Sequence, residues 1–280
     1  MDWIMWSLQR RLQLAVARVH GKTLTAEVSP PSFYRYQVKP NKMILRLQTT
    51  KVGKIRFASH RDIAKVWERS LRRAEIPLVY SEGFSPRPKI AFGLALPTGA
   101  ESECEYLDFH LDDQKYETSN ISSIPEVLNR VLPEGIAITG MVKMPSKYIS
   151  LQQSVTSTVW GIEVKESIEE VHKWVKTVLN SKELIIERTR KGKKVVDDIR
   201  PYIRDIEVQE SALLKRPTIQ AELRTQPRSL RPSELLAAVK PDLTMVKLRR
   251  LKQFIDTGDN QIDPIDLGDC LNFDLELCSP

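Results

Sequence analysis

Apolar positions in residues 43–145 alternate in some segments and recur every three or four residues in others. Alternation predicts strands at residues 44–49, 55–58, 78–81, 89–96, 104–111 and 136–144. Ser59 and Asp62 have capping-box spacing and open an amphipathic helix. Ser123 and Glu126 repeat that spacing before a second helical stripe. The resulting order is β-α-β-β-α-β with one extra hairpin, which is the split ferredoxin-like plan.

The same order returns in residues 155–256, where only the topology repeats and no residue motif does. Ser167 and Glu170 have capping-box spacing and open a helix, and Pro232 stands at the first position of a short one. Predicted strands cover residues 160–164, 184–190, 195–208, 217–225 and 244–254. Of these, 184–190 and 195–208 are expected to form one long hairpin around Lys191-Gly192-Lys193.

The predicted fold is therefore α+β, with two tandem ferredoxin-like domains built on antiparallel sheets. Domain 1 spans residues 43–145 and domain 2 spans residues 155–256. Residues 146–154 are polar and aperiodic and form the predicted linker. Residues 1–42 are predicted to be a poorly ordered basic extension, and residues 257–280 a solvated acidic tail.

Composition narrows the class of protein. The 280 residues fit two small domains, with 41% hydrophobic and 28% charged residues in a globular balance. No apolar run approaches the roughly 18 residues that a membrane span needs. Three scattered cysteines argue against a disulfide framework and fit a reducing cytoplasm, and four distant histidines predict no metal site. The common nucleotide-binding and hydrolase motifs are absent, which weakens an enzyme interpretation.

Charge is distributed unevenly along the chain. The net charge is +7, yet residues 253–280 contain seven acids and no Lys or Arg, which leaves +14 on residues 1–252. Within domain 1, residues 42–89 carry a net +8 and residues 90–145 a net −6. Such an excess of positive charge over most of the chain is typical of proteins with polyanionic partners, although other soluble proteins share it.

The predicted helix after Ser59 concentrates this positive charge on one face. Its cations recur at three- and four-residue intervals, opposite an apolar stripe centred on Trp67. They are Arg61, Lys65, Arg69, Arg72 and Arg73. Only Glu68, expected to pair with Arg72, offsets the row. The helix face is either an anion-binding surface or an ordinary solvated face.

The segment that follows, residues 80–89, combines two aromatics and two cations with glycine and prolines. Cations can neutralise phosphates while an aromatic face stacks on an unpaired base, as in the recognition of single-stranded RNA. Tyr80 and Phe84 would then contact bases, and Arg87 and Lys89 phosphates. Alternatively, the two aromatics are core residues at strand ends.

Several motifs together resemble one bacterial family. They are KIRFASHRD at 54–62, LRRAEIPLVYSEGFSPRPKI at 71–90, LPTGAES at 96–102, EYLD at 105–108, RKGK at 190–193 and DIRPYI at 198–203. This combination resembles the radical-SAM-linked family, a domain of unknown function found fused to or beside cobalamin-binding-type radical SAM proteins. The resemblance covers about residues 43–256.

The resemblance implies a partner rather than a radical enzyme, because the chain lacks the Cys-x-x-x-Cys-x-x-Cys motif of a radical SAM cluster. The partner is expected to carry the iron–sulfur cluster and S-adenosylmethionine, and this chain no cofactor. The family supplies no catalytic residues to carry over. A fainter similarity to ferredoxin-like CRISPR RNA-processing nucleases makes His60 a weak candidate for general acid–base catalysis.

Three functions follow as hypotheses. The first is an RNA-binding or substrate-presenting accessory of a radical SAM enzyme in tRNA or rRNA modification. The second is a protein-interaction subunit without RNA contact, and the third a metal-independent ribonuclease. The residues predicted to contact RNA are Arg56, His60, Arg61, Lys65, Arg69, Arg72, Arg73, Tyr80, Phe84, Arg87, Lys89, Lys191, Lys193 and Arg200.

Overall fold

The computed structural model divides the chain into two compact units, Met1–Lys39 and Pro40–Pro280. It describes residues 17–19, 22–24, 42–112, 115, 118–145, 147–190, 192–209, 216–258 and 260–270. In the first unit, β1 (Ala17–Val19) pairs with β2 (Lys22–Leu24) in an antiparallel hairpin. Apart from this hairpin and Lys42, the extension that the sequence predicts at residues 1–42 lies outside the described residues.

Residues 42–145, the first half of the second unit, form four antiparallel strands in the order β6-β3-β5-β4. The strands are β3 (Lys42–Lys51), β4 (Ile90–Phe92), β5 (Glu101–Asp112) and β6 (Ile138–Met144). Helix α2 (His60–Arg73) follows β3, and the short helices η2 (Thr118–Ser123) and α3 (Ile124–Asn129) follow β5. The helix expected after Ser59 is thereby confirmed.

Four local predictions in the first half are wrong. The strand expected at residues 78–81 is reduced to two isolated β-bridges. Residues 55–58, expected as a strand, belong largely to the 3-10 helix η1 (Gly53–Phe57). The ammonium of Lys51 donates a hydrogen bond to the carbonyl of Ala58 (3.0 Å) and holds this segment folded back on β3. The strand expected at 89–96 is only β4, and Ser123 makes no side-chain capping bond.

Residues 155–256, the second half, repeat the arrangement with strands in the order β10-β11-β7-β12, all neighbours antiparallel. The strands are β7 (Ser157–Val164), β10 (Ile203–Gln209), β11 (Thr218–Arg224) and β12 (Met245–Asp256). Helix α5 (Ile168–Asn180) follows β7, and α6 (Pro232–Leu236) follows β11. The capping box of Ser167 and Glu170 is confirmed at the start of α5.

The long hairpin expected at residues 184–208 is divided in two. Strands β8 (Ile185–Arg190) and β9 (Lys193–Asp198) pair with each other, and the 3-10 turn η3 (Arg200–Tyr202) separates β9 from β10. The carboxylate of Asp198 accepts the backbone N–H groups of Leu184 and Arg200, which fixes that turn. Pro201 lacks an N–H and cannot continue a strand ladder.

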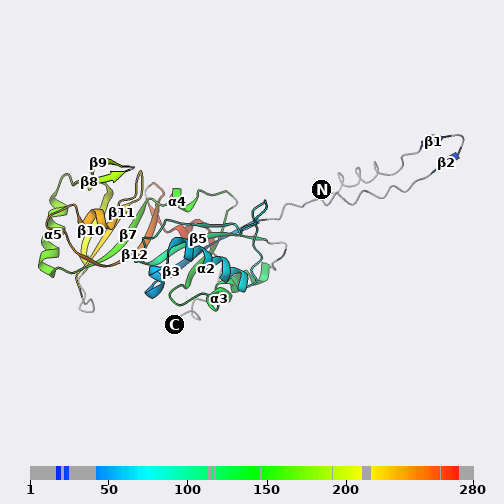
Figure 1. The fold of residues 1–280 in the computed structure, drawn as a ribbon, viewed down its shortest axis with the longest axis horizontal. Helices are drawn as coiled ribbons and strands as arrows, with labels where there is room; N and C mark the ends of the chain where they lie inside the picture. The colour runs from blue at the N-terminus through cyan, green and yellow to red at the C-terminus, as the bar shows by residue number, and fades with distance from the viewer. Residues whose placement is uncertain are drawn as a thin grey trace. The chain divides into compact units, whose positions relative to one another are not determined.

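The two halves share one ten-stranded sheet rather than separate sheets. Its central connection, which we call the seam, is a parallel pairing of β12 with β5 that sets Arg249 opposite Glu101 and Arg250 opposite Ser102. In Figure 1, the orange β12 lies between the green β7 and the strands of the first half. The mixed α+β class is thus confirmed, with a large and mostly antiparallel sheet.

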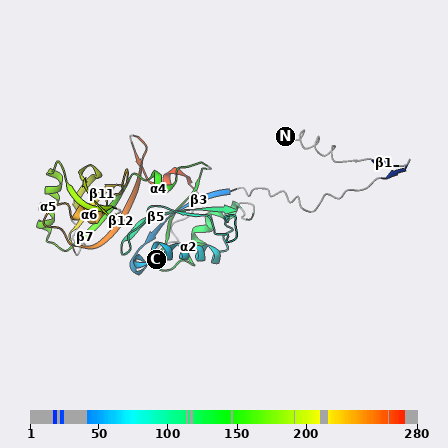
Figure 2. The ribbon, with the colours of Figure 1, turned by 45° about the horizontal axis from the view of Figure 1, so that its top comes forward.

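The two faces of the first-half sheet are covered differently. Helix α2 packs on one face, where Trp67 and Leu71 join a core with Leu107. On the opposite face α4 (Leu151–Ser154) places Leu151 against Tyr106, as Figure 2 shows with α2 and α4 on opposite sides of β5. Residues 146–154 therefore do not act only as the polar linker that the sequence predicted.

The C-terminal segment also packs against this second face, which corrects the prediction of a solvated tail at residues 257–280. Its described elements are β13 (Gln261–Ile262), η4 (Pro264–Leu267) and β14 (Asp269–Cys270). β13 pairs with β12 and β14 with β6. The hydroxyl of Tyr106 donates to the carboxylate of Asp263 (2.5 Å), so acidic residues here bond to the sheet. Residues 271–280 lie outside the described part of the chain.

Within the described residues, no helix is both long and apolar enough to cross a membrane.

Candidate nucleic-acid interface

Helix α2 is positioned by its cap and its apolar stripe. The hydroxyl of Ser59 accepts the backbone N–H of Asp62 (3.3 Å) and donates to its carboxylate (2.7 Å). This hydrogen bond, with the charge of Lys65, lowers the pKa of Asp62. Trp67 and Leu71 are buried against the sheet. The helix is therefore held firmly with its opposite face in solvent.

That exposed face carries the predicted cation row. All five members are exposed, and none has an ion-pair partner among the described residues; they are Arg61, Lys65, Arg69, Arg72 and Arg73. The expected pairing of Glu68 with Arg72 is not among the described ion pairs. With two acids, α2 has a net charge of +3.

Helix α5 provides an internal comparison, because it holds the same place in the second half as α2 does in the first. It contains two lysines and two glutamates, a net charge of zero. Both helices bury an apolar face on the shared sheet, so solubility alone does not require a cationic outer face. The excess of positive charge on α2 makes this helix the candidate anion-binding surface.

After α2 the chain forms a small projecting hairpin at the edge of the first-half sheet. Tyr80 bridges Pro88, and the backbone N–H of Ser81 donates to the carbonyl of Arg87 (2.8 Å). Phe84 lies at the tip with a relative exposure of 110%, so its ring stands wholly in solvent. Tyr80 and Arg87 are also exposed, and Lys89 is half-buried. The alternative that Tyr80 and Phe84 are core residues is therefore wrong.

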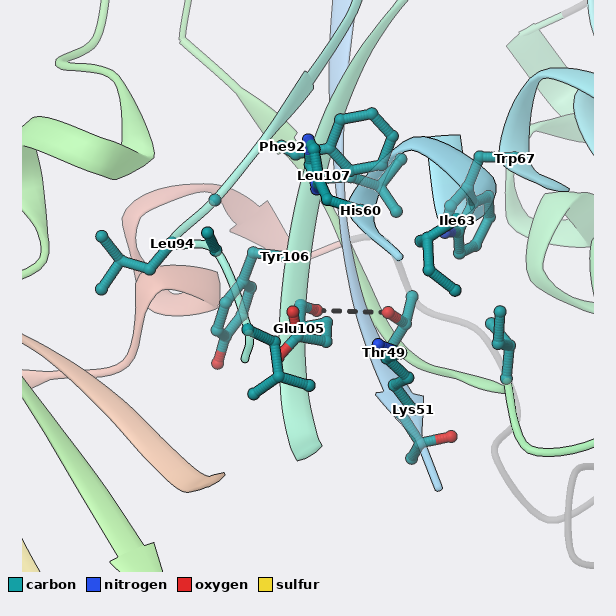
Figure 3. Close-up of a pocket in the computed structure, with 15 residues that line it drawn as sticks. Thr49, Lys51, His60, Ile63, Trp67, Phe92, Leu94, Glu105, Tyr106 and Leu107 are labelled. Carbon is teal, nitrogen blue, oxygen red and sulfur yellow. Dashed lines mark hydrogen bonds between the residues drawn. The ribbon is translucent and has the colours of Figure 1, made fainter. Parts of the chain in front are cut away.

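His60 faces away from the cation row. Its ring packs edge-on against Phe92, with 5.2 Å between ring centroids, and it lines a cavity together with Lys51 and Glu105 (Figure 3). This cavity of about 40 Å³ has room for only a few water molecules and is too small for a nucleotide. Burial lowers the pKa of Lys51, and Glu105 pairs with Arg250 (2.5 Å). The two charged groups beside His60 in this cavity already have polar partners, since Lys51 also donates to the carbonyl of Ala58.

Other predicted contacts lie elsewhere. The guanidinium of Arg200 donates to the carbonyls of Ser181 (3.2 Å) and Ile203 (3.3 Å), so it fixes the end of α5. Lys191 and the side chain of Lys193 lie outside the described residues, and Figure 1 shows the β8–β9 hairpin well apart from α2. The structure thus brings together the helix and the hairpin at 80–89, but not the second-half cations.

Arg56 belongs to a cluster that the sequence did not reveal. Its guanidinium lies over the ring of Phe57 (4.7 Å) and pairs with the carboxylate of Glu101 (3.1 Å). Lys247 and Arg249 reach the same carboxylate from the second half. Although burial acts to raise it, hydrogen bonds from Lys247, Arg249 and the backbone N–H of Gly53 bring the pKa of Glu101 down to about 2. The sequence predicts a short strand at residues 55–58, which gives no indication of this cluster.

Two features of the described residues bear on metal binding and thiol chemistry. No group of three His, Cys, Asp or Glu side chains there is arranged to hold a metal ion. Burial raises the pKa of Cys104 to about 12, which keeps its thiol protonated at neutral pH.

Comparisons with known proteins identify a family but no curated relative. A family model described as "Uncharacterized protein conserved in bacteria (DUF2344)" matches residues 45–232. No curated protein matches the sequence.

Two solved structures share a distant likeness. A chain in "Crystal Structure of a Cbf5-Nop10-Gar1 Complex" is 11% identical, with a TM-score of 0.38 over 75% of this chain and 48% of that one. A chain in "Structure of H/ACA RNP bound to a substrate RNA containing 2'-deoxyuridine" is 11% identical, with a TM-score of 0.34 over 74% and 46%. The chain spans about half the length of these solved chains.

Proposed function

From the premise that the chain belongs to the family of uncharacterized bacterial proteins DUF2344, we propose that it is an RNA-binding accessory protein. In this proposal it presents tRNA or rRNA to a radical SAM enzyme that modifies the RNA. The chain supplies the binding surface, and the partner supplies the iron–sulfur cluster and S-adenosylmethionine. In this proposal, the protein and its partner act in the cytoplasm.

The observation that carries the proposal is the pairing of two features along one stretch of chain. Five exposed cations without ion-pair partners among the described residues lie on α2, and a wholly exposed phenylalanine follows on the next hairpin. Cations bind phosphates in any sequence, and an exposed ring stacks on an unpaired base. A surface that only kept the protein soluble would need neither an excess of positive charge nor an exposed aromatic ring at Phe84.

The radical SAM partner rests on the motif resemblance, and the ferredoxin-like classification on topology. In each half, a helix follows the first of four strands. The fourth strand lies beside the first, and the third strand lies beside the second. That is the order of the split β-α-β plan. We classify the unit as two such halves joined at the seam.

The decisive experiment measures RNA binding against salt concentration. A fluorescein-labelled, 12-nucleotide single-stranded RNA is titrated with the full chain by fluorescence anisotropy. Replacing Arg69 and Arg73 with Ala should weaken binding and reduce the slope of log affinity against log salt by about 1.4, since each cation that neutralises a phosphate contributes about 0.7. Both side chains are exposed, so the fold should be unaffected.

The matched control removes two charges from the equivalent helix. Lys173 and Lys176 are exposed on α5, and their replacement with Ala should leave affinity and salt slope nearly unchanged. Equal losses in both double variants would show a general charge effect and contradict the proposal. If the α2 variant binds RNA like the parent but no longer co-purifies with a radical SAM protein, the surface serves protein docking instead.

A further inference from the structure

A groove lies where η1 and the loop before β5 meet the start of β12, so it is built from both halves. It has a volume of about 280 Å³, at the lower end of ligand-pocket sizes. The lining residues used below are Phe57, Met245, Val246 and Lys247. Neither half forms this groove alone.

Three large apolar side chains are exposed in this one place. The exposed fractions are 62% for Phe57, 41% for Met245 and 49% for Val246. Single exposed apolar residues are common, but a cluster that lines a groove marks a binding site. An aromatic ring flanked by apolar side chains offers a flat surface for another planar group.

The rim of the groove is cationic and fixed in place. Glu101, almost fully buried, binds Arg56 (3.1 Å) on one side of the groove and Lys247 (3.0 Å) on the other. The backbone N–H of Gly53 donates to the same carboxylate (3.1 Å). Lys54 does not line the groove but lies in η1 with Phe57; it is exposed and has no ion-pair partner among the described residues. Positive charge therefore exceeds negative charge around an aromatic surface.

We propose that this groove holds one unpaired nucleobase of RNA, stacked on Phe57, with its phosphate beside Lys54 and Lys247. The proposal deepens the proposed function and rests on it. Charge complementarity selects the occupant, because the cationic rim suits a phosphate and the apolar floor suits the face of a base. The arrangement needs both halves of the unit, so binding at the groove uses the seam.

The groove and the cation row are formed by neighbouring segments of the chain. Phe57 precedes Ser59, the N-cap of α2, and the projecting hairpin with Phe84 follows the end of that helix. A 14-residue helix rises about 21 Å, which corresponds to about six nucleotides of stacked strand at 3.4 Å each. The two exposed phenylalanines would thus mark the two ends of one bound single strand.

The test uses the same labelled 12-nucleotide RNA and the full chain. Phe57→Ala should weaken binding by about 5- to 100-fold with an unchanged salt slope, because the substitution removes a stacking surface and leaves every charge in place. Phe57→Trp should keep or increase the affinity. The matched control is Val196→Ala, which removes an equally exposed apolar side chain (61%) from the β8–β9 hairpin and should have no effect.

Photo-crosslinking gives an independent readout of position. An RNA of the same length that carries 4-thiouridine should crosslink to a peptide containing Phe57, and excess unlabelled RNA should suppress the crosslink. If the Arg69 and Arg73 variant loses RNA binding while Phe57→Ala binds normally and no crosslink maps to the groove, the groove proposal is wrong and the RNA-binding function stands. If the parent chain does not bind this RNA, both fail together.

Discussion

Arg249 and Glu101 lie 148 residues apart in sequence and face each other across the seam. The guanidinium of Arg249 donates two hydrogen bonds to one carboxylate oxygen of Glu101, at 3.0 and 2.7 Å, and a third to Glu103 at 2.7 Å. The backbones at these positions pair in parallel, whereas the other neighbouring strands of the sheet are antiparallel. This ion pair therefore secures the junction on which the groove beside Phe57 depends.

Replacing Glu101 with Gln should destabilise the unit by about 2 to 3 kcal/mol at pH 7, because three cations lose the carboxylate between them. Urea unfolding followed by tryptophan fluorescence measures this loss. Glu103→Gln is the control, since that carboxylate is about half exposed and should contribute less than about 1 kcal/mol. Equal effects of the two substitutions would contradict the role given to Glu101.

The contribution of Glu101 should also depend on pH. Its pKa of about 2 in the folded chain is below its ordinary value of 4.5, so the folded state favours the ionised carboxylate. The stabilisation is complete above the unfolded-state pKa and is lost as the pH falls through the folded-state pKa. The stability difference between the parent and Glu101→Gln should therefore shrink between about pH 5 and pH 2. A difference that stayed constant over this range would show that the pKa is not depressed.

The helices were predictable because their signals are local. Ser59 and Asp62 lie one turn apart, and the stripe through Trp67 repeats at helical spacing, so residues 59–73 encode both the cap and the buried face of α2. The cation row follows from the same period. The seam was not predictable in this way, because nothing in the sequence around Glu101 or Arg249 indicates that these two residues pair.

The C-terminal segment shows a second limit. Its acidic composition predicts solvation, yet Asp263 accepts a hydrogen bond from Tyr106, and Pro264 is buried. Charge composition predicts whether a segment is polar but not whether the sheet offers polar partners for it. Here the second face of the first-half sheet carries Arg46 and Tyr106, which provide those partners.

Truncation after Asp256 should lower the stability of the whole unit. It removes Pro264, whose carbonyl accepts a hydrogen bond from Arg46 (2.9 Å), and Ile265, which packs against the second face. Truncation after Cys270 retains all of these interactions and is the matched control. Thermal unfolding should give a lower midpoint for the shorter chain than for the longer one. Identical midpoints would restore the prediction of a tail that does not pack.

The buried pair of Arg46 and Asp108 should be sensitive to the loss of one partner. Two hydrogen bonds join them, at 2.7 and 2.9 Å, and both side chains are almost fully buried. Asp108→Asn should cost about 3 to 5 kcal/mol, because the guanidinium keeps its charge without a counter-charge. The double replacement Arg46→Met with Asp108→Leu should be less destabilised, as measured by urea unfolding. A double variant that is less stable than Asp108→Asn would contradict this account.

Phe84→Ala tests the stacking role of the projecting hairpin. Because the ring is wholly exposed, its removal costs no buried area, and the unfolding midpoint should not change. Affinity for the 12-nucleotide RNA should fall by about 5- to 100-fold with the salt slope unchanged. Arg87→Ala, a neighbouring exposed cation, should instead flatten that slope by about 0.7. If Phe84→Ala flattened the salt slope as Arg87→Ala does, Phe84 would have no base contact. The hairpin would then bind RNA through charge alone.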